Sequence, residues 1–139
     1  MRVLLAVAVG GLIGTGLRLA CDLWFPHAGG ELPVETLIVN LVGAFALGWL
    51  VGGLWTRPAV PPWLKAGLGP GLIGSFTTLS AVMASLIVLT REGETWLAAI
   101  YLVVSVAGGL LLAAAGLKLG SRLAHRPMPH EVSDAGATL

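Results

Sequence analysis

Long apolar stretches separated by short polar ones dominate the pattern of this chain. Apolar residues run almost without interruption through four segments, residues 3–24, 34–55, 63–89 and 96–119. Each segment reaches the roughly 20 residues with which a helix crosses the ~30 Å hydrocarbon core of a bilayer. The pattern therefore predicts an all-α integral membrane fold, with four transmembrane helices within residues 1–120 and a polar, disordered tail over residues 121–139.

Composition agrees with this fold and narrows the possible functions. The 139 residues are 56% hydrophobic and only 11% charged, which lies outside the range of ordinary soluble domains. A net charge of +1, with no basic stripe, argues against a nucleic-acid partner. The polar residues form neither a nucleophile–base pair nor a phosphate-binding loop. We therefore expect a membrane protein surrounded by lipid, and not an enzyme.

Lysine and arginine are distributed unevenly between the two sides of the membrane. With four spans, both termini and the loop between the second and third spans share one side. That side carries Arg2, Arg57, Lys65, Lys118, Arg122 and Arg126. The opposite side carries Arg91 beside several acidic residues. Basic residues collect on the cytoplasmic side of a membrane, so both termini are predicted to lie in the cytoplasm, with the protein in the plasma membrane.

The third segment has the composition of an interrupted helix. Residues 67–80 hold four glycines, one proline and four hydroxyl residues within an apolar run. Glycine and proline are the weakest helix formers. In lipid, an interrupted backbone survives only where it is buried in protein or lines a wet cavity. We therefore predict a break in the third helix that presents carbonyls and hydroxyls to a polar ligand, most simply an ion.

Polar side chains inside the other spans are candidates for a solute pathway, because polar groups are costly in a membrane. Asn40 offers uncharged amide donors, and Thr36 lies one turn earlier on the same face. Tyr101 and Ser105, four residues apart, offer two hydroxyls on one face of the fourth span. Such donors suit an anion that must bind and then leave. A second interpretation of Asn40, a hydrogen bond that joins two helices, remains open.

Arg18 is the ionisable residue well inside the first span. It can attract an anion at the mouth of a pore, or it can simply pair with Asp22, four residues further along the helix. Both interpretations remain open. None of these candidates is a carboxylate at mid-depth, which argues against a proton-coupled cation pump.

Three stretches together resemble the signature sequences of the CrcB/Fluc family of fluoride channels. They are GLIGTGLR at residues 11–18, TLIVNLVGAF at 36–45 and GLIGSFTTLS at 71–80. The resemblance covers all four spans in order, roughly residues 3–119. It implies a fluoride-specific channel through which fluoride leaves the cell passively. It also implies an antiparallel dimer with two fluoride pores and a structural, untransported sodium ion at its centre.

The resemblance further implies roles for individual residues. The backbone carbonyls of Gly74 and Thr77 would hold the sodium ion, which fits the predicted break. The implied fluoride pathway comprises Asn40, Ser80, Tyr101, Ser105, Arg18 and Thr36.

The chain also departs from this family pattern. Leu79 and Val82 stand where the family has the phenylalanines that line its pores, and Gly109 stands where it has a serine. A self-pairing antiparallel dimer needs a weak charge bias, whereas the bias of this chain is strong. We therefore expect a heterodimer with a paralogous subunit rather than a homodimer.

Two alternative functions are kept. The chain could be a non-conducting or regulatory partner subunit of such a channel. It could also be a small four-span cation or drug exporter, although that class needs a glutamate inside the first span, and residues 3–19 contain none.

Overall fold

The structure, a computed structural model, describes residues 1–24 and 32–124. Every regular element in this part of the chain is helical. The elements are α1 (Arg2–Trp24), α2 (Val34–Trp49), η1 (Leu50–Leu54), α3 (Pro62–Ala66), η2 (Gly67–Ile73), α4 (Gly74–Phe76), α5 (Leu79–Arg91) and α6 (Thr95–Ala124). They form four runs long and apolar enough to cross a membrane. The predicted all-α fold with four spans is confirmed.

The four spans follow the expected order, with small differences at their ends. The second span is α2 with η1, and the third joins α3, η2, α4 and α5. The fourth span, α6, continues to Ala124, so the first residues of the expected tail are helical. Residues 125–139, which include Arg126, lie outside the described residues.

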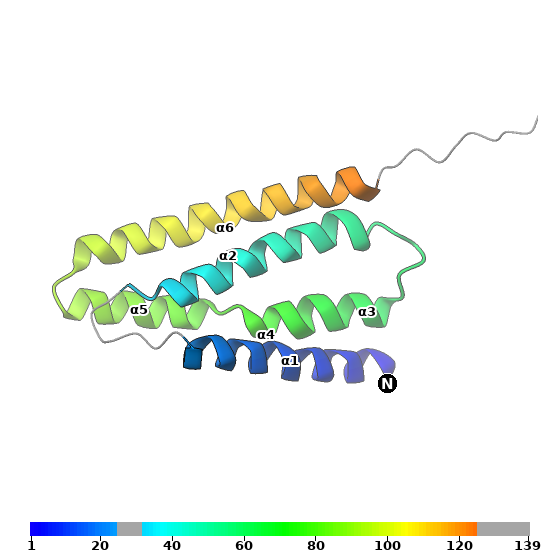
Figure 1. Cartoon of the computed structure of the whole chain (residues 1–139), viewed down its shortest axis with the longest axis horizontal. Coiled ribbons are helices and arrows are strands. Elements are labelled where there is room, and N and C mark those ends of the chain that lie inside the picture. Colours follow the sequence, from blue (N-terminus) through cyan, green and yellow to red (C-terminus); the bar gives the residue numbers. More distant parts are fainter. Residues whose placement is uncertain (25–31, 125–139) are drawn as a thin grey trace, which may run out of the picture.

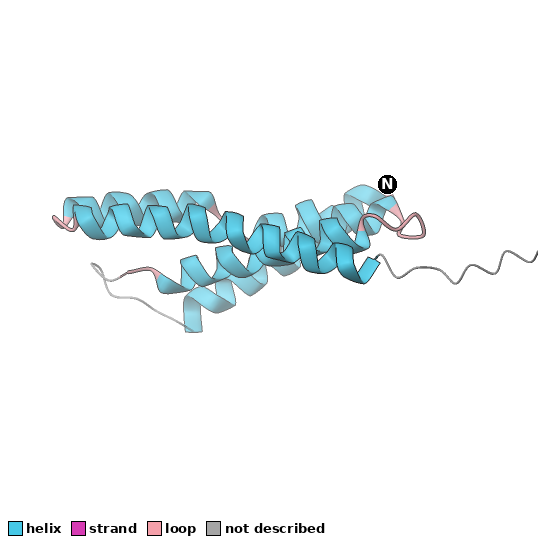
Figure 2. Cartoon of the chain, turned by 90° about the horizontal axis from the view of Figure 1, so that it is seen from above, coloured by secondary structure: helices cyan, strands magenta, loops and turns pink. Residues whose placement is uncertain are grey.

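Two pairs of neighbouring segments make up the bundle. Figure 1 shows α1 alongside α3 and α4, and α2 alongside α6. The second half of the third span, α5, packs mainly against α6. Seen from above, the helices cross near the middle of the bundle (Figure 2). The N-terminus and the C-terminal end of α6 lie at the same end, as four spans require (Figure 1).

Glycines allow these helices to approach backbone to backbone. A Cβ added at Gly14 of α1 would overlap the carbonyl oxygen of Leu72 in η2. A Cβ added at Gly116 of α6 would overlap the carbonyl oxygen of Phe45 in α2. Between lipid-embedded helices no hydrophobic effect drives association, so close contact between small residues supplies the attraction.

The interior of a single chain is small. The buried cluster comprises Val82, Leu89, Ala98 and Tyr101, where α5 meets α6. Many large apolar side chains are exposed, as on α1, where Leu12 is 77% exposed. Such a surface is stable only against lipid or against another protein.

The break in the third span is confirmed, but it does not fall at the proline. Pro70 lies within η2, whose wider π-helical turns continue the helix. The chain leaves the helical conformation only at Thr77 and Thr78, which are both extended. A π-helical turn changes the hydrogen-bond pattern locally, and so accommodates a residue that has no N–H. The first half of the span therefore stays wound despite its composition.

Candidate functional site

The break consists of two extended residues between two helices. Helix α4 ends at Phe76, Thr77 has φ −86° and ψ 152°, and Thr78 has φ −150° and ψ 123°. Helix α5 then begins at Leu79. The C-terminal end of one helix and the N-terminal end of the next therefore meet inside the bundle. These ends carry partial negative and positive charge respectively.

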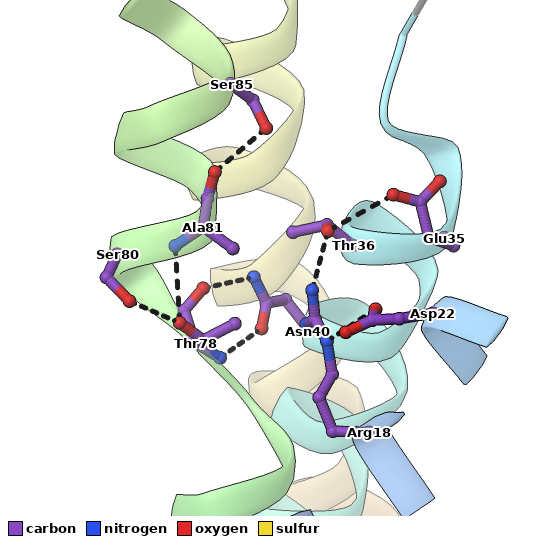
Figure 3. Close-up of polar contacts among 9 residues, drawn as sticks. All are labelled: Arg18, Asp22, Glu35, Thr36, Asn40, Thr78, Ser80, Ala81 and Ser85. Atoms are coloured by element: carbon purple, nitrogen blue, oxygen red, sulfur yellow. Dashed lines mark hydrogen bonds and ion pairs between the residues drawn. The ribbon is translucent and has the colours of Figure 1, made fainter. Parts of the chain in front are cut away.

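The side chain of Asn40 on α2 holds the break through two hydrogen bonds. Its Nδ2 donates to the carbonyl oxygen of Thr78 at 2.9 Å, and its Oδ1 accepts from the Thr78 N–H at 2.8 Å. Figure 3 shows the amide facing the backbone of Thr78. The side chain of Asn40 therefore links helix α2 to the break in the third span. One amide hydrogen remains for a ligand, since the group has two donors.

Thr78 also caps the second helix. Its Oγ1 accepts from the N–H of Ala81 at 3.3 Å and shares a 2.8 Å hydrogen bond with the Ser80 hydroxyl (Figure 3). Threonine is a favoured N-cap residue, because its oxygen satisfies one N–H that the first turn leaves unpaired. Ser80, a predicted pathway residue, is exposed and lies at this cap.

Two carbonyls at the break lose their helical partners. In a continuous helix, the N–H of residue i bonds to the carbonyl of residue i−4. The Thr78 N–H, which would bond to Gly74, goes instead to Asn40. The Ala81 N–H, which would bond to Thr77, goes instead to the Thr78 hydroxyl. The carbonyls of Gly74 and Thr77 are the two predicted sodium ligands.

An open groove of about 380 Å³ lies beside the break. Its polar lining includes Asn40, Ser105, Thr77 and Thr78. An adjoining apolar groove of about 580 Å³ shares lining residues with it and extends between α2 and α6 towards Leu117. The two grooves therefore share part of their lining on α2 and α6.

The two positions that depart from the family pattern also line this groove. Leu79 is 69% exposed, whereas Val82 is 3% exposed and belongs to the buried cluster. Gly109 lines the groove as well, and a Cβ added there would meet nothing within 4 Å. Apolar or missing side chains stand at all three positions.

The predicted hydroxyls of the fourth span lie on the inner side of α6. Tyr101 is 1% exposed, and its hydroxyl lies near those of Ser85 and Ser105 without a well-formed hydrogen bond to any described residue. The buried Ser105 hydroxyl, one turn further along, also has none there. Buried polar groups are normally paired, so two unpaired hydroxyls on one face favour a bound water or ligand.

Arg18 belongs to a polar cluster that joins α1 to α2. Its Nε donates to Asp22 Oδ1 at 2.9 Å, and its Nη2 donates to Thr36 Oγ1 at 2.8 Å (Figure 3). Thr36 donates in turn to Glu35 Oε1 at 3.4 Å. The expected pair with Asp22 is therefore present. Arg18 Nη1 is buried without a partner among the described residues, so the two N–H groups of Nη1 are left over.

The predicted site residues thus fall into separate groups. Asn40 and Ser105 line the groove, with Leu79 and Val82. Tyr101 lies in the core, whereas Arg18 and Thr36 lie in the polar cluster and are not among the groove residues.

Two residues of the site carry roles that the sequence analysis did not assign. Thr78 caps α5, and a hydroxyl residue directly before an apolar run is a signal for an N-cap. Glu35 is only 8% exposed and accepts a hydrogen bond from Thr36 in the polar cluster. Its place in the first turn of α2, where a carboxylate is favoured, is the signal that could have identified it.

Fold and site together define a small four-span membrane protein with an interrupted helix beside an open groove. Transport proteins use such interrupted helices to present carbonyls and helix ends to ions. The family described as CrcB-like protein, Camphor Resistance (CrcB), matches residues 5–117. The chain belongs to this family.

Curated relatives cover most of the chain. A protein of Azotobacter vinelandii named Fluoride-specific ion channel FluC is 43% identical over 118 residues, which are 84% of this chain and 95% of that protein. A protein of Geobacillus kaustophilus named Fluoride-specific ion channel FluC 2 is 40% identical over 115 residues, 82% of this chain and 89% of that protein. Both names describe ion channels and not enzymes.

Proposed function

We propose that this protein is a subunit of a fluoride-specific ion channel that lets fluoride leave the cell passively. The observation that carries the proposal is the open groove at the helix break, which contains the hydrogen-bond donors of Asn40 and Ser105 in a chain whose relatives are named fluoride channels. A channel must replace the water around fluoride by fixed donors that bind it only weakly. Amide and hydroxyl groups do this without a countercharge.

Further donors extend the proposed pathway at its two ends. The unpaired hydroxyl of Tyr101 lies one turn before Ser105 on α6, and Ser80 lies at the N-terminal end of α5. That helix end carries partial positive charge, which favours an anion. Arg18, with Thr36, supplies positive charge between α1 and α2, and its unpaired Nη1 can attract fluoride at the outer mouth.

A sodium ion is the proposed structural cofactor. The carbonyls of Gly74 and Thr77 would hold it, since their helical partners bond elsewhere. Sodium is a hard cation that prefers oxygen, and the C-terminal end of a half-helix carries partial negative charge. The ion would neutralise these carbonyls and fix the break, and it would not be transported.

The chain is proposed to work as an antiparallel dimer. Its groove is open, with Leu79 69% exposed, so a second subunit is needed to enclose a pore. The strong charge bias and the absence of aromatic side chains at Leu79 and Val82 favour a heterodimer with a paralogous subunit. Numbered names among the relatives, FluC 1 and FluC 2, agree with paired subunits. Both termini would face the cytoplasm of the plasma membrane.

A non-conducting partner subunit is the second candidate function, because Leu79 and Val82 leave this groove without aromatic edges. An aromatic edge carries partial positive charge that can contact an anion. A four-span cation or drug exporter is disfavoured by the relatives, which are named fluoride channels.

Fluoride efflux from liposomes tests the proposal. The protein is reconstituted alone and with a paralogous subunit, in sodium and in sodium-free buffer, with chloride as the control anion. We expect fluoride-selective efflux that depends on sodium and needs the paralogous subunit. Efflux from this chain alone would show that it forms a homodimer. Absence of efflux in both preparations would contradict the channel function.

A further inference from the structure

Asn40 holds the break in a way that a pathway donor does not need. Its amide makes two hydrogen bonds, of 2.9 and 2.8 Å, to the carbonyl and the N–H of one residue, Thr78. An amide that pairs with both backbone groups of a residue acts as a strand neighbour would, and it favours the extended conformation that Thr78 adopts.

The same face of α2 also makes room for the other residue of the break. Gly43 lies one turn after Asn40, and a Cβ added at Gly43 would overlap the methyl group of Thr77. Helix α2 therefore receives Thr77 at Gly43 and pairs with Thr78 at Asn40. Both extended residues are held by one turn of a neighbouring helix.

The hydrogen bond to Asn40 determines which acceptor the Thr78 N–H has. The N–H of Thr78 has two possible acceptors: the Gly74 carbonyl in a continuous helix, or the Asn40 side chain across the bundle. Inside a membrane an unpaired N–H is costly. Without the Asn40 acceptor, the helix would therefore close and the N–H would engage the carbonyl of Gly74.

We propose that Asn40 is a positioning residue for the cation site, because its amide keeps the Thr78 N–H away from the Gly74 carbonyl and so leaves that carbonyl free for sodium. This inference rests on the proposed function, which supplies the cation. Asn40 would then have two roles: its amide positions the cation site, and it also donates a hydrogen bond to the solute in the groove. One amide hydrogen bonds to Thr78, and the other remains for the solute.

Sodium-dependent thermal stability tests this role without measuring transport. The detergent-solubilised protein, with its partner subunit where one is required, is heated over a range of sodium concentrations at constant ionic strength, with choline as the replacement cation. Asn40→Ala is expected to raise the sodium concentration that gives half of the stabilisation by about tenfold. Such a shift corresponds to closure of the break in about nine molecules out of ten.

Ser105→Ala provides the matched control. Ser105 lines the same groove but makes no hydrogen bond to the break, so its substitution should leave the sodium midpoint unchanged while it reduces efflux. If Asn40→Ala does not give a folded protein, Asn40→Ser replaces it. Its side chain is one bond shorter than the amide and does not bridge to Thr78, so a shift in the same direction is expected.

The outcomes separate this inference from the proposed function. An unchanged sodium midpoint in both Asn40 variants, together with reduced efflux, would overturn the positioning role and leave Asn40 as a pathway donor. If the thermal stability of the wild-type protein does not depend on the sodium concentration, both the inference and the proposed sodium site are contradicted. Efflux from the same preparation then decides independently whether the protein is a fluoride channel.

Discussion

The two halves of the third span are held by different interactions. The first half, α3 to α4, contains Pro70 and four glycines, yet it is wound as helix and packs closely against α1. The second half, α5, has good helix formers but starts only after two extended threonines. In the first half close backbone packing decides the structure, and in the second half side-chain hydrogen bonds decide it.

The comparison shows that propensity does not locate the break. Glycines in the first half are needed for contact: a Cβ added at Gly71 would lie 3.0 Å from the carbonyl oxygen of Val7. The break falls instead where Asn40 offers Thr78 an alternative to the helix. In a membrane, where every backbone group needs a partner, the available partners decide which residues leave the helix.

The largest effect is expected from removing the close packing of the first half. Gly14→Ala places a methyl group against the carbonyl of Leu72 and should separate α1 from η2. We expect loss of most of the folded protein, measured as the monodisperse fraction after detergent extraction. Gly16→Ala is the control on the same helix, because nothing lies within 4 Å of its added Cβ. Equal yields from both variants would contradict the packing explanation.

The second-largest effect is expected on fluoride efflux, from a residue of α6, the helix that packs against α5. Ser105→Ala removes a buried hydroxyl that has no partner among the described residues, so stability should not fall. If that hydroxyl donates to fluoride, efflux should fall about tenfold, since one hydrogen bond to a charge contributes at least the 1.4 kcal/mol of that factor. Thermal stability and liposome efflux are measured on the same preparation. Unchanged efflux would remove Ser105 from the pathway.

The sequence predicts the four spans and the existence of the break better than it predicts the site. Apolar run lengths locate all four spans, because a bilayer demands about 20 residues for each. The carbonyls of Gly74 and Thr77 could be proposed from the family resemblance. The pairing of Asn40 with Thr78 joins residues 38 positions apart, and no local pattern contains it.

A moderate effect is expected from the cap of the second half. Thr78→Val keeps the side-chain shape and the backbone pairing with Asn40 but loses the acceptor for the Ala81 N–H. Loss of an N-cap costs about 1 kcal/mol of stability. Thermal unfolding should show this decrease, and Thr78→Ser, which keeps the hydroxyl, should restore most of it. A full loss in the serine variant would show that the methyl group, and not the cap, is responsible.

The smallest effect is expected where the sequence places its strongest helix breaker. Pro70→Ala restores an N–H in η2, several residues before the break, and changes neither Asn40 nor the two threonines. If side-chain hydrogen bonds hold the break, the sodium midpoint and the fluoride efflux of this variant should equal those of the wild type. A modest gain in thermal stability is compatible with this outcome, because alanine favours helix more than proline does. A marked increase in the sodium requirement would instead show that Pro70 prevents the third span from closing into a continuous helix. The contrast between its two halves would then originate in backbone propensity after all.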